Sequence, residues 1–535
     1  MSLATGGEHV VDALRAEGVR TVFGIPGFHN LAIYDALIAQ GEIRHVLARH
    51  EAGAGFMADG YARASGEPGV AIVTTGPAAT YALTPLVESY AGSVPVLLIA
   101  SDIASDLIGR GLGALHEVPN QIDALRPVTR WAETLGEARA IPGAIAGAFD
   151  LLRSGPPGPI ALSIPWDFLG ARVDTACPAG RHGARPPCHV ADVAEAARVL
   201  ATAVRPLVIA GGGVIAAGAE RELGEVARRL GAPVVASVGG RGAVSERDPL
   251  FHGVLPDRRA SAGPLRRADV ILAVGTKFGH RSLEKLGLAL DPAQSLIHLD
   301  LDPGVIGRAF KPRVALVGDA RDGLTRLAAA LPSATTASGW DRDWLARVKA
   351  DTGPRYTREI AALIDTLRSA LPDDAIVVCD QTGLTYWMEY RFPVLMPRTF
   401  LYPTGSATLG YAVPAAIGAK VARPDRPVVA VAGDGGFMYS VNELATAVKY
   451  RLPVIFLVVN DERFGAIRWL QERLFGRSGE ADLTNPDFMT LARAFGCRGE
   501  RVDPTSLGPA IARALAADGP TLLELPAAVD PPWEM

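Results

Sequence analysis

The most informative segment of the chain is VVAVAGDGGFMYSVNELATAVKYRLPVIFLVVNDERFG, from Val428 to Gly465. It contains two apolar runs; Asp434 follows the first, and Asp461 follows the second, 27 residues further on. A strand, a helix and a return strand need about 30 residues, and the crossover between parallel strands is right-handed. Both carboxylates are therefore predicted to lie at one edge of a parallel sheet, where open α/β sheets bind their ligands.

The same alternation of short apolar runs and longer helical patterns extends through the chain. Examples of the apolar runs are GVAIVTT (69–75), PVLLIA (95–100), PLVIAGG (206–212) and DVILAVG (269–275). Continuous apolar strands separated by helices are typical of parallel sheets that are buried on both faces. The predicted fold class is therefore α/β, built from doubly wound parallel sheets.

Two stretches without periodicity divide the 535 residues into three predicted domains. One lies near 169–189, and the other is PSATTASGWD at 332–341. The predicted domains are 1–170, 190–332 and 345–535. The first and third domains share a predicted order of elements, because 69–100 and 427–460 both show the pattern strand, glycine turn, helix and strand. This similarity is consistent either with two ordinary βαβ units or with two related domains that have different roles.

The composition excludes several classes of protein. Hydrophobic residues make up 49% and charged residues 21%, which suits buried cores and not a disordered chain. The net charge of −4 argues against nucleic-acid binding. The four cysteines form no CxxC pair, no apolar run is long enough for a membrane span, and no signal peptide is visible. We expect a soluble, cytoplasmic protein without a nucleic-acid or membrane partner.

Two carboxylates at one sheet edge, with a glycine turn between strand and helix, suit a hard divalent cation. Mg²⁺ prefers oxygen ligands and often takes part of its shell from a phosphate. The backbone amides of Gly435–Phe437, at the start of the helix, would receive that phosphate. The alternative is a tight turn in which Asp434 only caps the helix. The separation of Asp434 from Asp461 favours the metal site.

This segment resembles the cofactor motif of thiamine diphosphate (ThDP) enzymes, which begins with GDG and ends with two asparagines. The resemblance implies that Asp434, Asp461 and the carbonyl of Arg463 hold Mg²⁺ against the diphosphate. It also implies a diphosphate-binding role for the third domain, with cofactor contacts from Gly433, Gly435, Gly436 and Phe464. One departure is that Asp461 stands where the family usually has Asn, which adds a negative charge beside the diphosphate.

A second resemblance lies in RHVLARHEAGAGFMADGYARASG, from Arg44 to Gly66. It is similar to the family's activating motif, which makes the first domain the pyrimidine-binding domain and Glu51 the catalytic glutamate. In the family this carboxylate binds N1′ of the aminopyrimidine and promotes loss of the C2 proton. The alternative is a first-turn helix residue that the helix dipole favours. Because the family's glutamate and diphosphate site come from different subunits, the resemblance implies a homodimer or homotetramer.

Further positions follow from the same resemblance. LYPTGSATLGYAVPAAIGAK (401–420) implies that Leu409 lies between the two cofactor rings and that the carbonyl of Ala407 faces the 4′-amino group. His116 occupies a loop position where acetohydroxyacid synthases carry a Gln; it is either a proton shuttle or an exposed loop histidine. The other implied positions are Thr382 and Gly383 at the diphosphate, His29 as a catalytic candidate, and Phe28, Ala466, Ile467 and Leu470 in the substrate pocket.

The central domain carries PLVIAGGGVIAAG (206–218), which suggests a dinucleotide site but lacks GxGxxG. No acidic residue ends the next strand, PVVASVGG, as ribose binding would require. Some family members bind FAD in this domain and others leave it empty. We expect an empty domain, with FAD as the alternative.

The leading functional hypothesis is a decarboxylase that converts a 2-oxo acid to an aldehyde through a C2 ylid and an enamine. The alternatives are an acetolactate synthase-like carboligase, a transferase that joins the enamine to a second carbonyl, and an FAD-linked oxidase. A non-catalytic relative is also considered, but Glu51 and Asp434 argue against it. The motifs are most similar to those of guanidino-oxopentanoate and benzoylformate decarboxylases.

Overall fold

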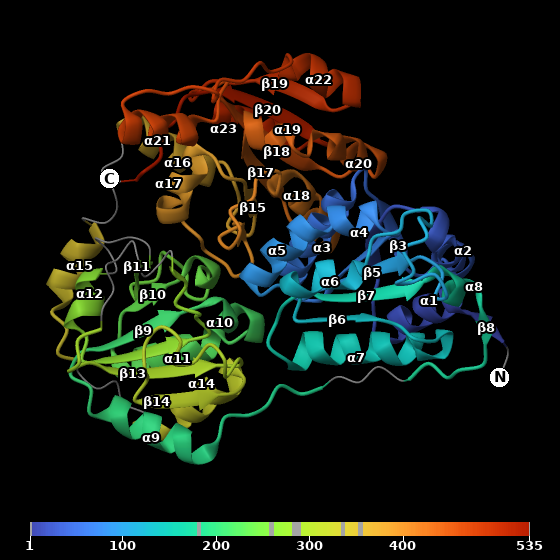
Figure 1. Cartoon of the computed structure of the whole chain (residues 1–535). Helices are drawn as coiled ribbons and strands as arrows, with labels where there is room; N and C mark the ends of the chain where they lie inside the picture. The colour runs from blue at the N-terminus through green and yellow to red at the C-terminus, as the bar shows by residue number, and fades with distance from the viewer. Residues whose placement is uncertain are drawn as a thin grey trace.

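Three six-stranded parallel sheets, each flanked by helices, make up the chain (Figure 1). The computed structural model describes residues 3–178, 183–255, 262–280, 290–332, 338–350 and 357–533. Alternate residues along each strand contribute to different cores. In β17 (Val428–Gly433), Val428 and Ala430 lie in one hydrophobic cluster, and Val429 and Val431 lie in another. Each sheet is therefore buried on both faces, and the predicted α/β class with three doubly wound sheets is confirmed.

The first sheet has the strand order β3-β2-β4-β5-β7-β6. Its strands are β2 (Thr21–Gly24), β3 (Arg44–Leu47), β4 (Gly69–Val73), β5 (Val96–Asp102), β6 (Trp131–Thr134) and β7 (Ile160–Pro165). Its helices are α1 (Gly6–Ala16), α2 (Leu31–Gln40), α3 (Glu51–Ser65), α4 (Pro77–Tyr81), α5 (Leu83–Gly92), α6 (Gln121–Leu125), α7 (Ile141–Ser154) and α8 (Trp166–Gly170). A separate antiparallel pair joins β1 (Ala4–Thr5) to β8 (Arg172–Val173).

The third sheet repeats this topology, with the order β16-β15-β17-β18-β20-β19. Besides β17, its strands are β15 (Ile376–Cys379), β16 (Phe400–Leu401), β18 (Val454–Asn460), β19 (Arg498–Arg501) and β20 (Thr521–Pro526). Its helices are α16 (Arg358–Ser369), α17 (Gly383–Arg391), α18 (Ala412–Ala422), α19 (Asp434–Met438), α20 (Leu444–Lys449), α21 (Gly465–Phe475), α22 (Phe488–Phe495) and α23 (Leu507–Leu515). The identical order favours the interpretation of the outer domains as related.

The middle sheet has the order β11-β10-β9-β12-β13-β14, which is the order of doubly wound dinucleotide-binding folds. Its strands are β9 (Pro206–Ala210), β10 (Val234–Ala236), β11 (Phe251–Val254), β12 (Val270–Val274), β13 (Ser295–Asp300) and β14 (Val314–Val317). The helices are α9 (Val190–Ala201), α10 (Gly212–Ala217), α11 (Glu220–Leu230), α12 (Ala262–Arg267), α14 (Ala320–Ala330) and α15 (Arg342–Ala350).

Helix α15 belongs with the middle sheet. Leu345 of α15 and the preceding Trp340 lie in one hydrophobic cluster with Leu207 and Ile271 of the middle strands. The indole of Trp340 also donates to the carbonyl of Pro206 at 2.8 Å. The sequence assigned residues from 345 onward to the third domain, and we propose instead that this domain begins after α15.

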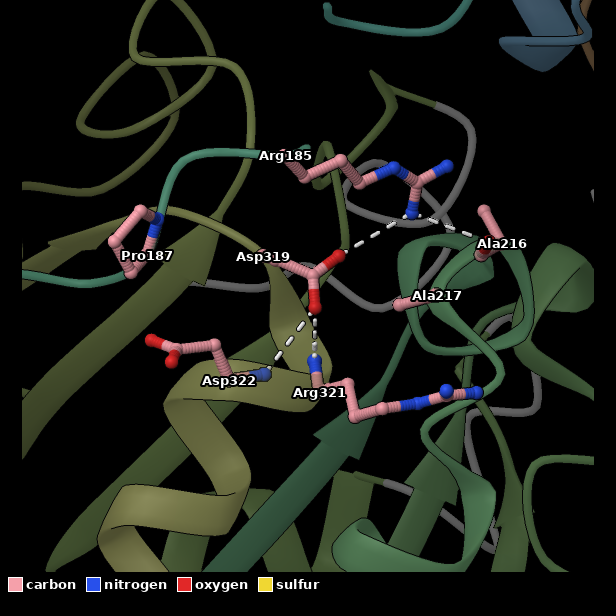
Figure 2. A pocket seen from close by; sticks show the side chains of 7 residues that line it. All are labelled: Arg185, Pro187, Ala216, Ala217, Asp319, Arg321 and Asp322. Carbon is pink, nitrogen blue, oxygen red and sulfur yellow. Dashed lines mark hydrogen bonds and ion pairs between the residues drawn. The ribbon is translucent and has the colours of Figure 1, made fainter. Parts of the chain in front are cut away.

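Arg185 anchors the segment that leads into the middle domain by hydrogen bonds to that domain (Figure 2). Its guanidinium donates to the carbonyl of Ala216 at 3.1 Å and to Asp319 at 3.4 Å. Asp319 also caps α14 by accepting from the backbone amides of Arg321 and Asp322. The open hollow at this point measures about 380 Å³, and its charged groups hold the linker against the middle sheet.

The outer domains pack directly against each other through α3 and α18, and one hydrophobic cluster spans both sheets. Gly60 of α3 lies against the carbonyl of Ala415, and Gly418 of α18 lies against the carbonyl of Met57. A side chain at either glycine would collide with the opposing backbone, so both helices need glycine at this crossing. In the described part of the chain, no helix combines the length and apolarity that a bilayer span requires.

Candidate active site

Asp434 and Asp461 meet at one edge of the third sheet, as the sequence predicts. Strands β17 and β18 are parallel neighbours, and Gly433 pairs with Val459 in register. Asp434 therefore begins α19 directly beside Asp461, which follows Asn460 at the end of β18. The two carboxyl groups share a hydrogen bond.

The electrostatics of this pair suit a cation. Burial and the charge of Asp434 raise the pKa of Asp461 to about 7, although the nearby Arg463 opposes this shift. Burial also raises the pKa of Asp434. The amide of Asn485 donates to Asp434 at 2.6 Å and to Asn460 at 3.2 Å, a contact that sequence reasoning missed because Asn485 lies outside the motif.

The donor set fits Mg²⁺ bound together with a diphosphate. The described residues contain no group of three or more His, Cys, Asp or Glu side chains that would enclose a metal. Two carboxylates and a backbone carbonyl leave room for phosphate oxygens, which is the usual environment of Mg²⁺ beside a nucleotide or diphosphate. A divalent cation would also relieve the repulsion between Asp434 and Asp461.

The predicted glycines form a cradle whose neighbours come from separate segments. A Cβ at Gly435 would lie 2.6 Å from the ring of Phe464, and one at Gly433 would lie 2.8 Å from Thr382 Oγ1. A Cβ at Gly436 would lie 3.5 Å from Leu409. The structure therefore brings together the predicted cofactor contacts of four segments. Gly383 begins α17 beside Thr382, with its backbone packed against Val529.

A buried carboxylate, Asp380, lies beneath this cradle. It accepts hydrogen bonds from the backbone amides of Gln381 at 2.8 Å and Ala412 at 3.0 Å. Burial raises its pKa to about 6, although these and other amide hydrogen bonds oppose the shift. Ala407, in the same loop as Leu409, has a φ of 53°, which is left-handed and unusual for alanine. The loop is therefore held in a conformation that its own sequence disfavours.

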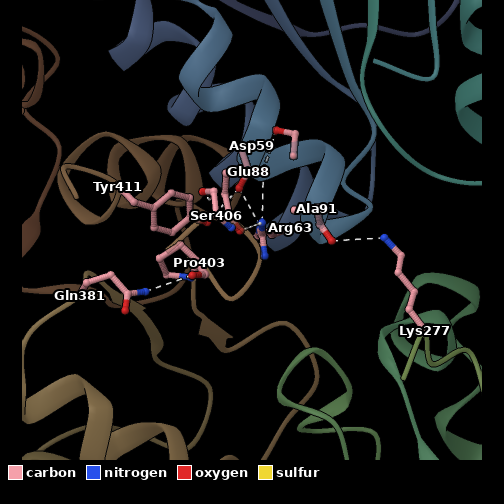
Figure 3. A network of polar contacts seen from close by, with 10 residues as sticks. Asp59, Arg63, Glu88, Ala91, Lys277, Gln381, Pro403, Ser406 and Tyr411 are labelled. Atoms are coloured by element: carbon pink, nitrogen blue, oxygen red, sulfur yellow. Dashed lines mark hydrogen bonds and ion pairs between the residues drawn. The ribbon is translucent and has the colours of Figure 1, made fainter. Parts of the chain in front are cut away.

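The first domain supplies the groups that hold this loop (Figure 3). Glu88 accepts from the backbone amide of Ser406 at 2.9 Å and from its hydroxyl at 2.7 Å. Arg63 lies between Asp59, at 2.6 Å, and Glu88, at 3.0 Å. The hydroxyl of Tyr411 donates to Asp59 at 2.9 Å. This network was not predicted from the sequence. Asp59 and Arg63, with opposite charges one helical turn apart, could have indicated the ion pair in it.

An aromatic cluster beyond the carboxyl ends of the first sheet's strands contains both predicted histidines. The rings of His29 and His116 lie 5.7 Å apart, and His29 stacks on Trp166 at 6.0 Å. Phe28 lies 6.2 Å from Trp166. His29 Nδ1 also lies 2.9 Å from Thr75 Oγ1. Burial, and then the neighbouring His116, lower the pKa of His29, so its ring is neutral at physiological pH. Trp166 was missed because it follows a strand without a motif.

Glu51 begins α3 and lies in the first domain, close enough to Tyr34 that its charge, together with burial, raises the pKa of that hydroxyl. Ala466, Ile467 and Leu470 lie on α21 of the third domain. Figure 1 shows α21 and α8 on opposite sides of the molecule. The predicted substrate-pocket residues of the first domain, beside α8, and those on α21 therefore form two separate groups in one chain.

A cavity of about 650 Å³ lies where the three domains meet. It is lined by Gly212 and Gly213 after β9, by Gly275 and Lys277 after β12, and by Asp300 at the end of β13. These residues follow the carboxyl ends of the strands at the point where the strand order reverses, which is the ligand-binding position of this topology. The glycines after β9 do not have the GxGxxG spacing, so this position does not carry the dinucleotide motif.

Comparisons with known proteins agree with these geometries. The N-terminal, central and C-terminal domain models of thiamine pyrophosphate enzymes match residues 4–125, 193–327 and 380–525. A probable 2-ketoarginine decarboxylase of Pseudomonas aeruginosa is 40% identical, over 97% of this chain and 94% of the relative. A probable acetolactate synthase large subunit of Methanocaldococcus jannaschii is 33% identical, over 98% and 92%. An acetolactate synthase isozyme 3 large subunit of Escherichia coli is 34% identical, over 96% and 93%. The chain therefore belongs to the thiamine pyrophosphate enzyme family.

Proposed function

We propose that the protein is a ThDP- and Mg²⁺-dependent enzyme that decarboxylates a 2-oxo acid to an aldehyde. The observation that carries the proposal is the hydrogen-bonded pair of Asp434 and Asp461 beside the cradle of Gly433, Gly435 and Gly436. When bound, ThDP supplies the carbon nucleophile and the electron sink that loss of CO₂ requires.

The chain's own groups have separate roles in this proposal. Asp434, Asp461 and the Arg463 carbonyl bind Mg²⁺, and Leu409 and the Ala407 carbonyl orient the cofactor rings. Glu51 holds a proton at the pyrimidine N1′ position. His29 is buried and its pKa is lowered, so its neutral ring would accept a proton near the reacting carbon, beside the ring of His116.

We propose that the enzyme is a cytoplasmic homodimer or homotetramer in which two chains complete each site. The support is that the two groups of predicted pocket residues lie apart in one chain and that their large apolar side chains are exposed. Phe28 is 64% exposed, Trp166 40% and Ile467 52%. Large apolar side chains with such exposure are commonly covered by a partner or a ligand.

For the substrate, we propose a 2-oxo acid with a long or aromatic side chain. The support is the aromatic lining by Phe28 and Trp166, which offers a flat apolar surface and favourable contacts to a cationic or planar group. The relative from Pseudomonas aeruginosa is named for 2-ketoarginine, whose guanidinium group has both properties. The second candidate is carboligation, favoured by the two acetolactate synthases that cover nearly the whole chain.

The cavity between the three domains is large enough to suggest that a second cofactor binds there. Its volume of about 650 Å³ and its position at the strand-order reversal support FAD binding more than the sequence did. We therefore propose FAD as an accessory ligand, in place of the empty domain expected from the sequence. Flavin absorbance of the purified protein, with and without added FAD, tests this point.

The test of the main proposal is a panel of 2-oxo acids in the presence of ThDP and Mg²⁺. The panel contains pyruvate, phenylglyoxylate and 5-guanidino-2-oxopentanoate, and both CO₂ and the organic product are measured. We expect CO₂ and aldehyde in equal amounts, with the guanidino acid the best substrate. Acyloin or acetolactate as the main product would instead support the carboligase, and no ThDP-dependent CO₂ from any acid would refute both.

A further inference from the structure

The turn that precedes Glu51 is held by the third domain of the same chain. Glu443 accepts hydrogen bonds from the backbone amide of Arg49 through both carboxylate oxygens, at 3.0 and 3.1 Å. It also accepts from the amide of His50 at 3.0 Å. Glu51 follows His50 and begins α3. The last two amides before Glu51 are therefore bound by one side chain.

Two further side chains of the third domain complete this contact. The hydroxyl of Tyr450 accepts from the amide of Leu47 at 2.8 Å. The hydroxyl of Thr446 lies 3.2 Å from the carbonyl of Leu47 and 2.7 Å from Glu443 Oε2. Thr446 thus orients the same carboxylate that binds the turn. Glu443, Thr446 and Tyr450 together bind Leu47, Arg49 and His50 in the connection from β3 to α3.

The site for Glu443 is built into both domains. Its side chain is completely buried, and Gly53 in the first turn of α3 leaves the space that the carboxylate occupies. Burial raises the pKa of Glu443, although Thr446 and the two backbone amides oppose the shift. A buried carboxylate is a costly way to gain stability, because an apolar contact of the same shape often does as well. We therefore expect Glu443 to matter more for where it holds the Arg49–His50 backbone than for the stability it adds.

We propose that Glu443 is a positioning residue that fixes the place and orientation of Glu51. The inference rests on the proposed function, in which Glu51 is the catalytic carboxylate. The side chain of Glu443 accepts hydrogen bonds from Arg49, His50, Asn442 and Thr446. Its effect on turnover therefore passes through the Arg49–His50 backbone.

One stretch of the third domain connects the two proposed sites. Asp434 begins α19 at the proposed diphosphate site, and Glu443 lies nine residues later at the turn before Glu51. In the proposed dimer, Glu51 completes a site with the partner subunit. The segment 434–450 then serves its own cofactor at one end and the neighbouring site at the other.

The experiment is a double-mutant cycle on the full-length enzyme with ThDP and Mg²⁺. Glu443→Gln keeps the shape of the side chain but places an NH₂ group where a carboxylate oxygen accepts a backbone amide. We expect kcat to fall about 10- to 100-fold, with the Kd for ThDP changed less than threefold. In the Glu51→Gln background, the same substitution should change kcat less than twofold, because its target is already removed.

Glu88→Gln is the matched control. It also removes a completely buried carboxylate from the contact between the outer domains, but it releases the Ser406 loop and not the turn before Glu51. We expect it to weaken ThDP binding and to combine multiplicatively with Glu51→Gln. If Glu443→Gln does not fold, Thr446→Val enters the same cycle, since it loosens both Glu443 and Leu47.

The outcomes separate this inference from the proposed function. Full turnover by Glu51→Gln would remove the proposed role of Glu51, and with it both claims. If Glu51→Gln is impaired and the effect of Glu443→Gln simply multiplies with it, or if kcat is unchanged, only the positioning role is refuted. The positioning role of Glu443 is supported if kcat falls strongly in both single variants and the double variant shows no further loss.

Discussion

The carboxyl group of Asp461 hydrogen-bonds that of Asp434 at the carboxyl edge of the third sheet. The residue at which this chain departs from its family's motif thus lies directly against the motif's aspartate. Two carboxyl groups this close cannot both ionise freely in a partly buried site, because each charge opposes the other. The departure therefore changes the charge that the proposed metal site presents, while keeping an oxygen ligand.

The first prediction concerns Asp461→Asn. At pH 8 the substitution removes the repulsion with Asp434, so the metal-free protein should gain about 1–2 kcal/mol of stability. Adding Mg²⁺ and ThDP should stabilise the variant less than the wild type, since one negative ligand is gone. Thermal unfolding in EDTA and in saturating cofactor measures both shifts. Asp482→Asn, an exposed neighbour of Arg468, is the control and should change neither; equal cofactor effects in wild type and Asp461→Asn would argue against metal binding here.

The second prediction concerns Glu51→Gln. Losing this carboxylate removes proton transfer at the pyrimidine, so kcat should fall at least about 100-fold. The diphosphate and metal contacts are on the other domain, so the Kd for ThDP, measured by fluorescence quenching, should stay within about threefold of wild type. Glu137→Gln, on the exposed surface of the same domain, should retain full activity. Loss of cofactor binding alone, without a kcat effect in saturating ThDP, contradicts the role.

The third prediction uses the pH dependence of Asp380. Its pKa is raised to about 6 from an ordinary value of 3.8, so the folded state holds a proton that the unfolded state releases earlier. The resulting stabilisation is complete below about pH 4 and is lost as the pH rises through 6. A shift of about two units corresponds to about 3 kcal/mol.

The measurement is urea unfolding between pH 4.5 and 7.5. The side chain introduced by Asp380→Asn cannot titrate. The free energy of unfolding of Asp380→Asn should therefore fall less than that of the wild type as the pH rises, and the difference should be a large part of that value of about 3 kcal/mol. Asp425→Asn is the control: a hydrogen bond from Arg423 lowers the pKa of Asp425 to about 2, so it does not titrate in this range. Parallel pH profiles for wild type and Asp380→Asn would be the contrary result.

The fourth prediction concerns the left-handed conformation of Ala407. A non-glycine residue there costs about 1 kcal/mol, so Ala407→Gly should raise the free energy of unfolding by about 0.5–1 kcal/mol. Cofactor affinity should be retained, because the proposed contact is the backbone carbonyl. Ala407→Val should destabilise the loop and weaken ThDP binding, since a β-branched residue disfavours this φ even more. Weaker binding by the glycine variant would show that the methyl group matters.

Sequence reasoning succeeded where a motif and its chemistry are local. The glycine turn and Asp434 are adjacent in the chain, and Asp461 is one crossover away, so a right-handed βαβ unit was enough to bring the carboxylates together. It failed for Asn485, Trp166 and Glu88, which reach their sites from other segments. Nothing in their immediate neighbours distinguishes them from ordinary loop or helix residues.

Local patterns in the sequence were enough to predict the α/β class and the third-domain carboxylate pair, because strand periodicity and short motifs involve neighbouring residues. They also make Glu51 the predicted catalytic carboxylate. Only the tertiary structure decided that Glu443 holds the turn before Glu51 and that Glu88 holds the loop with Ala407. The folded chain also keeps the predicted pocket residues of the first and third domains apart and leaves a cavity where the three domains meet. The hydrogen bonds of Glu443 and Glu88 join residues more than 300 positions apart, so no local sequence pattern predicts them.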